Sequence, residues 1–333
     1  MKPERVLVLG ASGAMARYMI PFLAENGCQV DGIALDKVES TNPSVKYYQG
    51  NAKELPMLRE FLSHNYDAIV DYLTYTTSEI PFYLPQLLDH TDHYIFLSSG
   101  RVYDNLEKPV KETSPRLIDS SKDTLLVNSD DYCIYKARGE NLLFSRPRKN
   151  WTIVRPATTY SYLRYQLVTL EAADTVGRAR QGKAAVLPVQ AREKPATLSW
   201  GGDAGRMIAR LLFKDAALGE DFNINSAENH TWGEIADYYK DICGLQAVWV
   251  DKEDYLKLIT PDPYAMNARW QLDYARLFRR RVDNSKVLAV TGMKQSEMRP
   301  LYDGLKMEID RTPADYPWPN NQRMDDYLAA MKK

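Results

Sequence analysis

The sequence predicts an α/β protein in which a doubly wound parallel sheet is joined to a smaller, mixed C-terminal domain. Over the first 155 residues, short apolar segments alternate with segments of helical periodicity, which is typical of βαβ units. A glycine-rich turn separates the first strand from the first helix, and the alternation loosens after Arg155. We expect one domain over residues 1–160 and a second over residues 161–333, partly interleaved with the sheet.

The expected strands of the first domain are short runs rich in β-branched and aromatic residues: Val6–Leu9, Val30–Leu35, Val45–Tyr48, Ala68–Tyr72, Tyr94–Ser98 and Thr152–Arg155. The expected helices between them are Ala14–Glu25, Leu55–Leu62, Ile80–Asp89 and Asp131–Phe144.

In the second domain we expect five helices, Gln166–Gly182, Asp203–Lys214, Thr231–Cys243, Ser285–Val290 and Gln295–Asp310. Short extended runs lie among them at Ala185–Pro188, Phe222–Asn225 and Ala247–Val250. The last twenty residues, rich in Asp, Pro and Asn around Trp318, are expected to form a tail on the surface.

Composition limits the class of protein. The 333 residues are 44% hydrophobic and 26% charged, with a formal charge of −1, so nothing favours a polyanionic partner such as nucleic acid. The three widely spaced cysteines argue against a disulfide framework and fit a reducing compartment. No apolar run has membrane-spanning length, and the first strand is too short for a signal core, so we expect a cytoplasmic protein without membrane contact.

The glycine turn runs from Gly10 to Ala16 and has the context of a Rossmann dinucleotide-binding motif. Gly10 allows the tight turn, Gly13 lets the backbone approach a pyrophosphate, and Ala16 gives close helix–strand contact. The N-terminus of the following helix offers N–H groups to phosphates. The alternative is a strand–helix turn that needs glycine for its own geometry.

Asp36 stands at the end of the second strand, 26 residues after Gly10. A carboxylate there accepts hydrogen bonds from the adenosine ribose hydroxyls and repels a 2′-phosphate, which favours NAD over NADP. Lys37 beside it weakens that exclusion. The alternative is a solvated loop aspartate.

A catalytic triple is formed by Ser99, Tyr132 and Lys136. Tyr132, Lys136 and Glu140 are spaced by four on one expected helix, so they share a face. A phenol titrates near 10, and an ammonium group one turn away would stabilise its anion. Tyr302 and Lys306 have the same spacing but no serine partner, and we expect them on a surface helix. The alternative for Tyr132 and Lys136 is a partly buried tyrosine beside a solvated lysine.

Taken together, these motifs resemble the extended short-chain dehydrogenases/reductases, the NAD-dependent epimerase/dehydratase family. The resemblance covers nearly the whole chain and includes Ser98–Tyr103, Glu112–Pro115, Val154–Pro156, Phe222–Asn225 and Asp283–Lys286. It implies that Ser99 orients the substrate oxygen, Tyr132 is the acid/base and Lys136 positions the cofactor. It implies a cofactor site made of Gly10, Ser12, Gly13, Ala14, Met15, Asp36, Asn51, Ala52, Leu73, Thr74, Lys136 and Ala157, and a substrate-binding second domain.

The chain departs from this family at several positions. Asp71–Thr77 replaces the usual His-x-Ala-Ala, and Asn51 replaces the usual acid near the adenine. The segment before Asp203 lacks the arginine that often grips a nucleotide diphosphate. Gly100 and Arg101 stand where dehydratases carry an acid pair, which disfavours dehydration. The region before Asp203 also resembles an atypical branch that includes chloroplast stem-loop-binding proteins.

Three further signals carry less weight. Asp89–His93 could suggest a metal site, but no third ligand cluster supports it and we expect no metal. Arg279–Arg281 could clamp phosphates, although a solvated helix end is the favoured reading. The tyrosines of Tyr160–Tyr165 could line a substrate pocket or pack under the second domain, and the sequence does not separate the two.

The main hypothesis is an NAD-dependent epimerase or dehydrogenase that acts on a sugar or nucleotide-sugar by reversible hydride transfer. The alternative is a cofactor-binding, non-catalytic or regulatory protein of the same fold, with nucleic-acid binding disfavoured by the charge. The resemblance also implies a homodimer formed through helices near Tyr132, with Ile134, Leu142, Leu143 and Phe144 available for contact or for the core.

Overall fold

The computed structural model describes residues 3–260, 262 and 265–331. The chain divides into two compact units. Unit 1 contains the chain up to Thr159 together with Gly201–Ser226 and Val282–Met298, and unit 2 contains Tyr160–Trp200, Ala227–Arg281 and the chain from Arg299. Each unit is described by itself.

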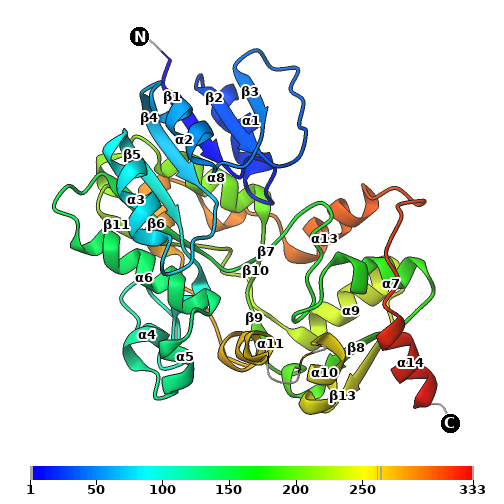
Figure 1. Ribbon diagram of the computed structural model, residues 1–333. Helices are drawn as coiled ribbons and strands as arrows, with labels where there is room; N and C mark the ends of the chain where they lie inside the picture. Colours follow the sequence, from blue (N-terminus) through cyan, green and yellow to red (C-terminus); the bar gives the residue numbers. More distant parts are fainter. Residues whose placement is uncertain (1–2, 261, 263–264, 332–333) are drawn as a thin grey trace. The chain divides into compact units, whose positions relative to one another are not determined.

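Unit 1 is built on a seven-stranded sheet among the described residues, with the strand order β11-β6-β5-β4-β1-β2-β3 and every neighbouring pair parallel (Figure 1). The strands are β1 (Arg5–Leu9), β2 (Gln29–Ala34), β3 (Val45–Gln49), β4 (Tyr66–Asp71), β5 (Thr91–Leu97), β6 (Trp151–Pro156) and β11 (Glu220–Ile224). The order reverses between β1 and β4, and ligands of open α/β sheets bind at the carboxyl ends of the strands beside such a reversal. The predicted doubly wound α/β class is therefore confirmed.

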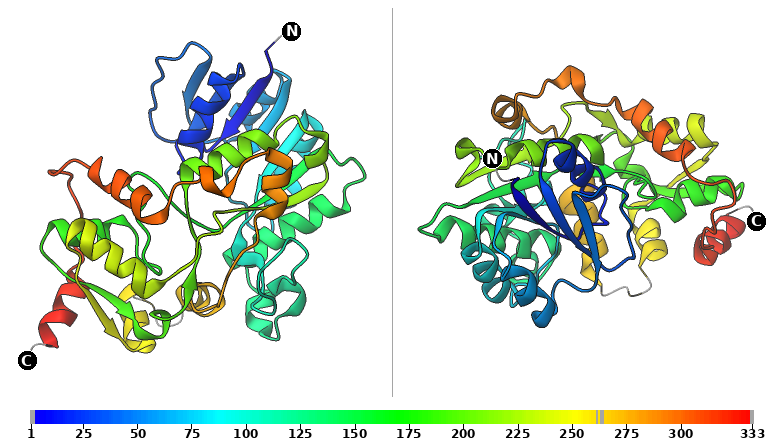
Figure 2. Two further views of the ribbon diagram at one scale, coloured as in Figure 1. Left: turned by 180° about the vertical axis from the view of Figure 1, so that it is seen from behind. Right: turned by 90° about the horizontal axis from the view of Figure 1, so that it is seen from above.

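Helices cover both faces of this sheet. The helices of unit 1 are α1 (Ala16–Glu25), α2 (Leu55–Leu62), α3 (Ile80–Asp89), α4 (Leu117–Ser120), α5 (Thr124–Asn128), α6 (Tyr132–Ser145), α8 (Gly201–Leu211) and α12 (Ser285–Thr291). The left view of Figure 2 shows α8 in light green beside α1 in dark blue.

The residues of β1 explain this two-layer arrangement. Val6 and Val8 pack with the apolar residues of α1 and α8, whereas Leu7 and Leu9 pack with those of α2 and α3. Successive side chains of a strand point to opposite faces, so a continuous apolar run must be covered on both sides.

Unit 2 is smaller and mixed. Its helices are α7 (Val176–Arg180), α9 (Trp232–Cys243), α10 (Lys252–Ile259), α11 (Met266–Gln271), α13 (Leu301–Asp310) and α14 (Gln322–Ala330). Its strands are β8 (Ala185–Pro188), β9 (Pro195–Ala196), β10 (Leu198–Trp200), β12 (His230–Thr231) and β13 (Ala247–Val250), and β7 (Thr158–Tyr160) runs across the boundary between the units. Within unit 2, β8 pairs with β13 in parallel and β9 pairs with β12 antiparallel.

The prediction of one helix over Gln166–Gly182 is wrong. Only a 3₁₀ turn at Ala172–Asp174 and the short α7 form there. Val168 has a φ of 56°, and the Thr175 hydroxyl donates to the carbonyl oxygens of Tyr165 and Glu171. Such local side-chain hydrogen bonds compete with a continuous helix.

The predicted helix Gln295–Asp310 is divided in two. A 3₁₀ turn occupies Gln295–Glu297, and α13 begins only after Pro300, which is its N-cap. Proline lacks an N–H and disfavours helical geometry in the residue before it, which accounts for the interruption.

The C-terminal segment, which the sequence predicts as a tail on the surface, contains the helix α14. The Asn321 side chain caps α14 by accepting from Met324 N at 3.1 Å, and Met324 is buried. Asp325 pairs with Arg178 at 2.8 Å and with Lys183. α14 is therefore attached to unit 2 through the buried Met324 and these ion pairs, while its other side chains are exposed or partly exposed.

Candidate functional site

The glycine turn after β1 is held by contacts that leave no space for larger residues. Gly10 has a φ of 80°, a conformation that favours glycine, and a Cβ on it would lie 3.2 Å from the Cβ of Tyr72. A Cβ on Gly13 would lie 3.1 Å from the carbonyl oxygen of Gly10. The backbone conformation therefore favours glycine at position 10, and the space at Gly13 is tight for any side chain.

Backbone N–H groups at this turn divide into two sets. Those of Gly10 and Ala11 donate to the Ile33 carbonyl at 3.0 and 2.9 Å, and that of Gly13 donates to Gly10. Among the described residues, the N–H groups of Ala14 and Met15 have no partner, as is usual at the start of a helix. This pattern fits a pyrophosphate at the N-terminus of α1, where the helix dipole favours negative charge.

Asp36 and Ser12 come together beside the turn. The Ser12 hydroxyl donates to Asp36 Oδ2 at 2.8 Å, which joins the loop after β2 to the glycine turn. Arg17 Nη2 donates to the Ser12 carbonyl at 3.4 Å. Because Asp36 is exposed, its second carboxylate oxygen can accept from a ribose hydroxyl.

Asn51 and Ala52 follow β3 at the same edge of the sheet. Asn51 Oδ1 accepts from Lys53 N at 3.0 Å, and Ala52 is buried. No hydrogen bond joins either residue to the other candidate residues within the described chain. Their role in holding an adenine therefore stays a prediction.

Lys136 lies between the ends of β4 and β5. Its Nζ donates to the carbonyl oxygens of Leu73 at 3.0 Å and Leu97 at 2.6 Å, and the side chain is buried. Burial lowers the pKa of Lys136 to about 8, although the charges of Asp71 and Glu140 act in the opposite direction. Two of its three N–H donors are used, so one is left for a ligand.

Tyr132 is the first residue of α6 and lies over two cations. Its ring centroid is 5.9 Å from Lys136 Nζ and 5.3 Å from the guanidinium carbon of Arg101. Asp131 caps α6 by accepting from Cys133 N at 3.0 Å. These contacts place the phenol next to positive charge, as the proposed acid/base role requires.

Ser99 follows β5 and is nearly buried. Its Oγ accepts from Arg101 N at 3.1 Å, which leaves the hydroxyl hydrogen to be donated elsewhere. A Cβ on Gly100 would lie 3.2 Å from the carbonyl oxygen of Pro156, and the Cα of Ala157 would be 3.8 Å away. The loop carrying Ala157 therefore packs against the serine segment, whereas Thr74 is exposed on the loop after β4.

Asp71 is a residue of this region that the sequence reasoning recorded only as a departure. Fully buried at the end of β4, it accepts from Leu73 N at 2.9 Å, Tyr75 OH at 2.9 Å and Tyr94 OH at 2.7 Å. Burial raises the pKa of Asp71, while the hydrogen bonds and Lys136 oppose the rise. A carboxylate ending a buried apolar strand was the available signal, because such a group needs partners.

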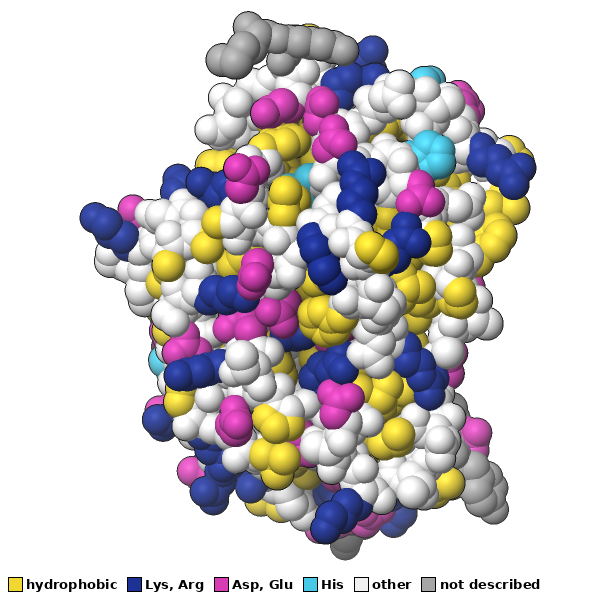
Figure 3. All heavy atoms as spheres, turned by 90° about the vertical axis from the view of Figure 1, so that its left-hand side faces the viewer, with side chains coloured by type: hydrophobic (Ala, Val, Ile, Leu, Met, Phe, Trp, Pro, Cys, Tyr) yellow, Lys and Arg dark blue, Asp and Glu magenta, His cyan; other side chains and the backbone are white. Residues whose placement is uncertain are grey.

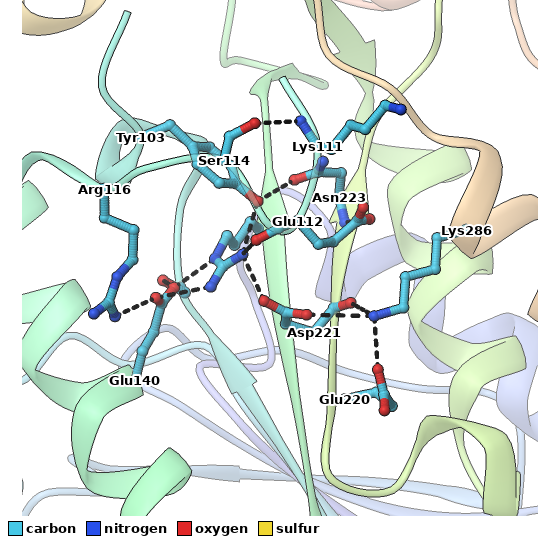
Figure 4. Close-up of polar contacts among 12 residues, drawn as sticks. Tyr103, Lys111, Glu112, Ser114, Arg116, Glu140, Glu220, Asp221, Asn223 and Lys286 are labelled. Carbon is cyan, nitrogen blue, oxygen red and sulfur yellow. Dashed lines mark hydrogen bonds and ion pairs between the residues drawn. The ribbon is translucent and has the colours of Figure 1, made fainter. Parts of the chain in front are cut away.

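Glu140, one turn beyond Lys136, belongs to a buried ionic network (Figure 4). It accepts from Arg155 Nε at 2.7 Å and Nη2 at 2.9 Å, from Arg116 Nη1 at 3.1 Å and from the Ser98 hydroxyl. Arg155 continues to Asp221 at 2.7 Å, which also pairs with Lys286 at 3.3 Å. Glu140 thus joins α6 to β6 through Arg155 and to the segment directly after β5 through Ser98.

The histidines of the Asp89–His93 segment, considered as metal ligands, have hydrogen-bond partners within the protein. His90 Nδ1 lies 2.7 Å from the Gln86 carbonyl and His93 Nε2 lies 2.8 Å from Thr152 Oγ1. Over the part of the chain that the structure describes, no three His, Cys, Asp or Glu side chains gather as a metal site.

Two tyrosine signals have structural explanations in unit 2. Tyr160 and Tyr165 are buried in its core, so packing accounts for them. Lys306 pairs with Asp310 at 2.6 Å, Tyr302 donates to Asp241, and both residues are on the exposed side of α13. Arg280 of the Arg279–Arg281 run donates to the Tyr274 carbonyl at 3.1 Å.

Surface composition bears on possible partners. On the face drawn in Figure 3, Lys and Arg side chains alternate with Asp and Glu and with hydrophobic side chains, so neither sign of charge forms a continuous area. Among the described residues, no helix is both long and apolar enough to cross a bilayer. All three cysteines are free thiols.

The comparisons with known proteins agree on the fold. No protein-family model and no curated protein sequence matches the chain. An epimerase structure from Methanothermobacter thermautotrophicus aligns with a TM-score of 0.69 and 13% identity, covering 99% of this chain and 94% of its own. A dTDP-glucose 4,6-dehydratase from Bacillus anthracis, in complex with NAD, aligns with a TM-score of 0.68 and 17% identity over 92% and 96%.

A third similar structure is the UDP-glucuronic acid 4-epimerase of Bacillus cereus in complex with UDP-glucuronic acid and NAD. It aligns with a TM-score of 0.67 and 16% identity, covering 92% of this chain and 98% of its own. Similarity at these identities establishes the fold. The resemblance to extended short-chain dehydrogenases/reductases is therefore confirmed at the level of the fold.

Proposed function

We propose that this chain is an NAD-dependent epimerase or dehydrogenase that acts on a sugar or nucleotide-sugar. The observation that carries the proposal is the position of Lys136. Its ammonium joins the loop after β4 to the last residue of β5, with the Tyr132 ring 5.9 Å away and Ser99 two residues beyond Leu97. The glycine turn beside β1 supplies N–H donors for a dinucleotide at the same edge of the sheet.

Tyr132, Ser99 and Lys136 have separate roles in the proposed proton transfer. Tyr132 removes the proton from a substrate hydroxyl, and Ser99 donates a hydrogen bond to the same oxygen as its charge changes. Lys136 lowers the cost of the tyrosine anion and uses its remaining N–H for the nicotinamide ribose. Bound NAD would accept and return a hydride at the adjacent carbon.

We favour NAD over NADP because the Ser12–Asp36 hydrogen bond holds a carboxylate beside the glycine turn, where it would accept from the ribose hydroxyls and repel a 2′-phosphate. A nucleotide-sugar substrate is supported by similar structures described in complex with UDP-glucuronic acid or UDP-glucose. Gly100 and Arg101 stand in the region where dehydratases of the resembled family carry an acid pair, so we prefer epimerisation or oxidation to loss of water. A homodimer and a cytoplasmic location remain part of the proposal.

The test follows nicotinamide absorbance and fluorescence in purified protein before and after a panel of nucleotide-sugars and free sugars is added. We expect reduced nicotinamide to appear with one sugar class and turnover to fall by about 10²-fold or more in Tyr132→Phe. Tyr302→Phe is the matched control, because Tyr302 and Lys306 have the same spacing on the exposed α13.

The outcomes separate the two function classes. Loss of turnover with retained NAD binding in Tyr132→Phe, and no change in Tyr302→Phe, supports the enzyme. NAD binding that no sugar reduces, and that Tyr132→Phe leaves unchanged, supports the non-catalytic alternative. Failure to bind any nicotinamide nucleotide overturns the interpretation of the glycine turn.

A further inference from the structure

Arg101 contacts two of the three candidate catalytic residues, Ser99 and Tyr132. Its backbone N–H donates to Ser99 Oγ at 3.1 Å, so its position helps to set the rotation of that hydroxyl. Its guanidinium lies over the Tyr132 ring, 5.3 Å from the centroid. One residue therefore contacts both the serine and the tyrosine of the triple.

The side chain of Arg101 is held by an enclosed ion pair. Its Nη2 lies 3.1 Å from Asp131 Oδ1, with the two side chains 14% and 2% exposed. The same Asp131 oxygen accepts from Cys133 N and so caps α6. The pair thus fixes the first turn of α6, where Tyr132 stands, against the segment that carries Ser99.

Charged groups lie close to the Tyr132 ring in the described part of the chain. Two of them are cations, Arg101 and Lys136, at 5.3 and 5.9 Å from the ring centroid. Asp131 is adjacent in sequence, and the Tyr135 ring packs edge-on at 5.4 Å. These distances run to the ring centroid rather than to the phenol oxygen. A nearby cation favours the charged form of a titrating phenol, and a nearby carboxylate disfavours it.

We propose that Arg101 is a positioning residue for the acid/base step, an inference that rests on the proposed function. Through Asp131 it fixes Tyr132 relative to Ser99, and its guanidinium acts with Lys136 to stabilise the tyrosine anion. Asp131 moderates this effect as the counter-charge. Removal of the cation and removal of the anion should therefore shift the titration of Tyr132 in opposite directions.

The experiment measures that titration without substrate. Tyrosines are labelled with ¹³C at Cζ, the Tyr132 signal is identified by its loss in Tyr132→Phe, and its chemical shift is followed with pH. Arg101→Gln should raise the pKa by roughly one unit, and Asp131→Asn should lower it. Asn remains a good N-cap, so Asp131→Asn keeps α6 capped.

Two further variants exclude a purely structural effect. The double variant Arg101→Gln/Asp131→Asn should titrate near the wild-type value because both charges are gone. Arg101→Lys should keep the wild-type titration while it loses the planar contact to Asp131, and it serves where Arg101→Gln does not fold. The basic limb of the pH profile of kcat/KM should move with the pKa measured by NMR.

The outcomes also separate this proposal from the proposed function. Shifts of the same sign in both single variants, or no shift in either, overturn the role of Arg101 even when the wild-type enzyme turns over. Opposite shifts in a protein without turnover overturn the acid/base step and leave only the electrostatic coupling. Opposite shifts together with a displaced pH profile support both.

Discussion

Glu140→Gln is the substitution whose effect the structure defines most directly. The Glu140 carboxylate is fully buried and accepts hydrogen bonds from Arg155, Arg116 and Ser98. Glutamine has nearly the same shape but no charge, and its NH₂ group would face a guanidinium donor. The substitution therefore removes the negative charge of a buried ionic cluster and leaves the guanidinium groups of Arg155 and Arg116 in place.

The loss of stability in Glu140→Gln depends on the ion-pair partners that Arg155 and Arg116 keep. Breaking a buried ion pair by removing one partner typically costs about 3–5 kcal/mol. Arg155 keeps Asp221 at 2.7 Å and Arg116 keeps Asp119 at 2.8 Å, so we expect the lower end, about 3 kcal/mol. For a domain of 150–250 residues this corresponds to a melting temperature lower by roughly 6–12 °C.

Differential scanning calorimetry measures this, with Asp92→Asn as the control. Asp92 pairs with Arg148 at 2.9 Å, but the side chains are 85% and 56% exposed, so we expect little change in melting temperature. Hydrogen exchange of β6 should quicken in Glu140→Gln only.

The pH dependence gives a second check. Burial alone would raise the pKa of Glu140, but the charge and hydrogen bonds of Arg155, with those of Ser98 and Arg116, lower it overall. The contribution of ionised Glu140 to the free energy of unfolding is therefore complete above the pKa of a free glutamate, about 4.3. This contribution is lost as the pH falls through the lower pKa of Glu140 in the folded protein. A variant that melts within about 2 °C of wild type at neutral pH would refute this reasoning.

Three further outcomes are expected. Gly205→Ala should destabilise unit 1 by about 1–3 kcal/mol in urea unfolding, because its Cβ would lie 2.9 Å from the Met15 carbonyl and push α8 off α1; an unchanged midpoint would contradict this packing. Asp36→Asn should move the ratio of NAD to NADP affinity, measured by calorimetric titration, toward NADP by roughly tenfold, and an unchanged ratio would exclude Asp36 from the ribose site. The pKa of Lys136 is about 8 in the folded protein and near 10.4 in the unfolded chain, so the free energy of unfolding should rise with pH between these values. Urea unfolding at two pH values within this range should show the rise in the wild type and not in Lys136→Met. A rise that persists in Lys136→Met would have to come from other groups.

The sequence predicted most of unit 1 because its strands are apolar on both faces. The runs of β1 and β4 through β6 can be buried only between two helical layers, and the bounds of α2 and α3 agree with the prediction. Unit 2 was predicted less well. There, the interruption before α13 and the formation of α14 depend on Pro300 and on the partners of Asp325, which a periodic pattern does not reveal.

The candidate site shows the same division. The chemical types and their order along the chain, namely the glycine turn, Ser99, Tyr132 and Lys136, could be predicted from the amino-acid sequence, because turn geometry and helical spacing are local properties. The pairing of Arg101 with Asp131 across thirty residues, and the contacts of Lys136 with the loop after β4 and the end of β5, come from the three-dimensional fold. The physical reason is that parallel strands bring their carboxyl ends together from distant parts of the chain, and buried charges there must find their partners.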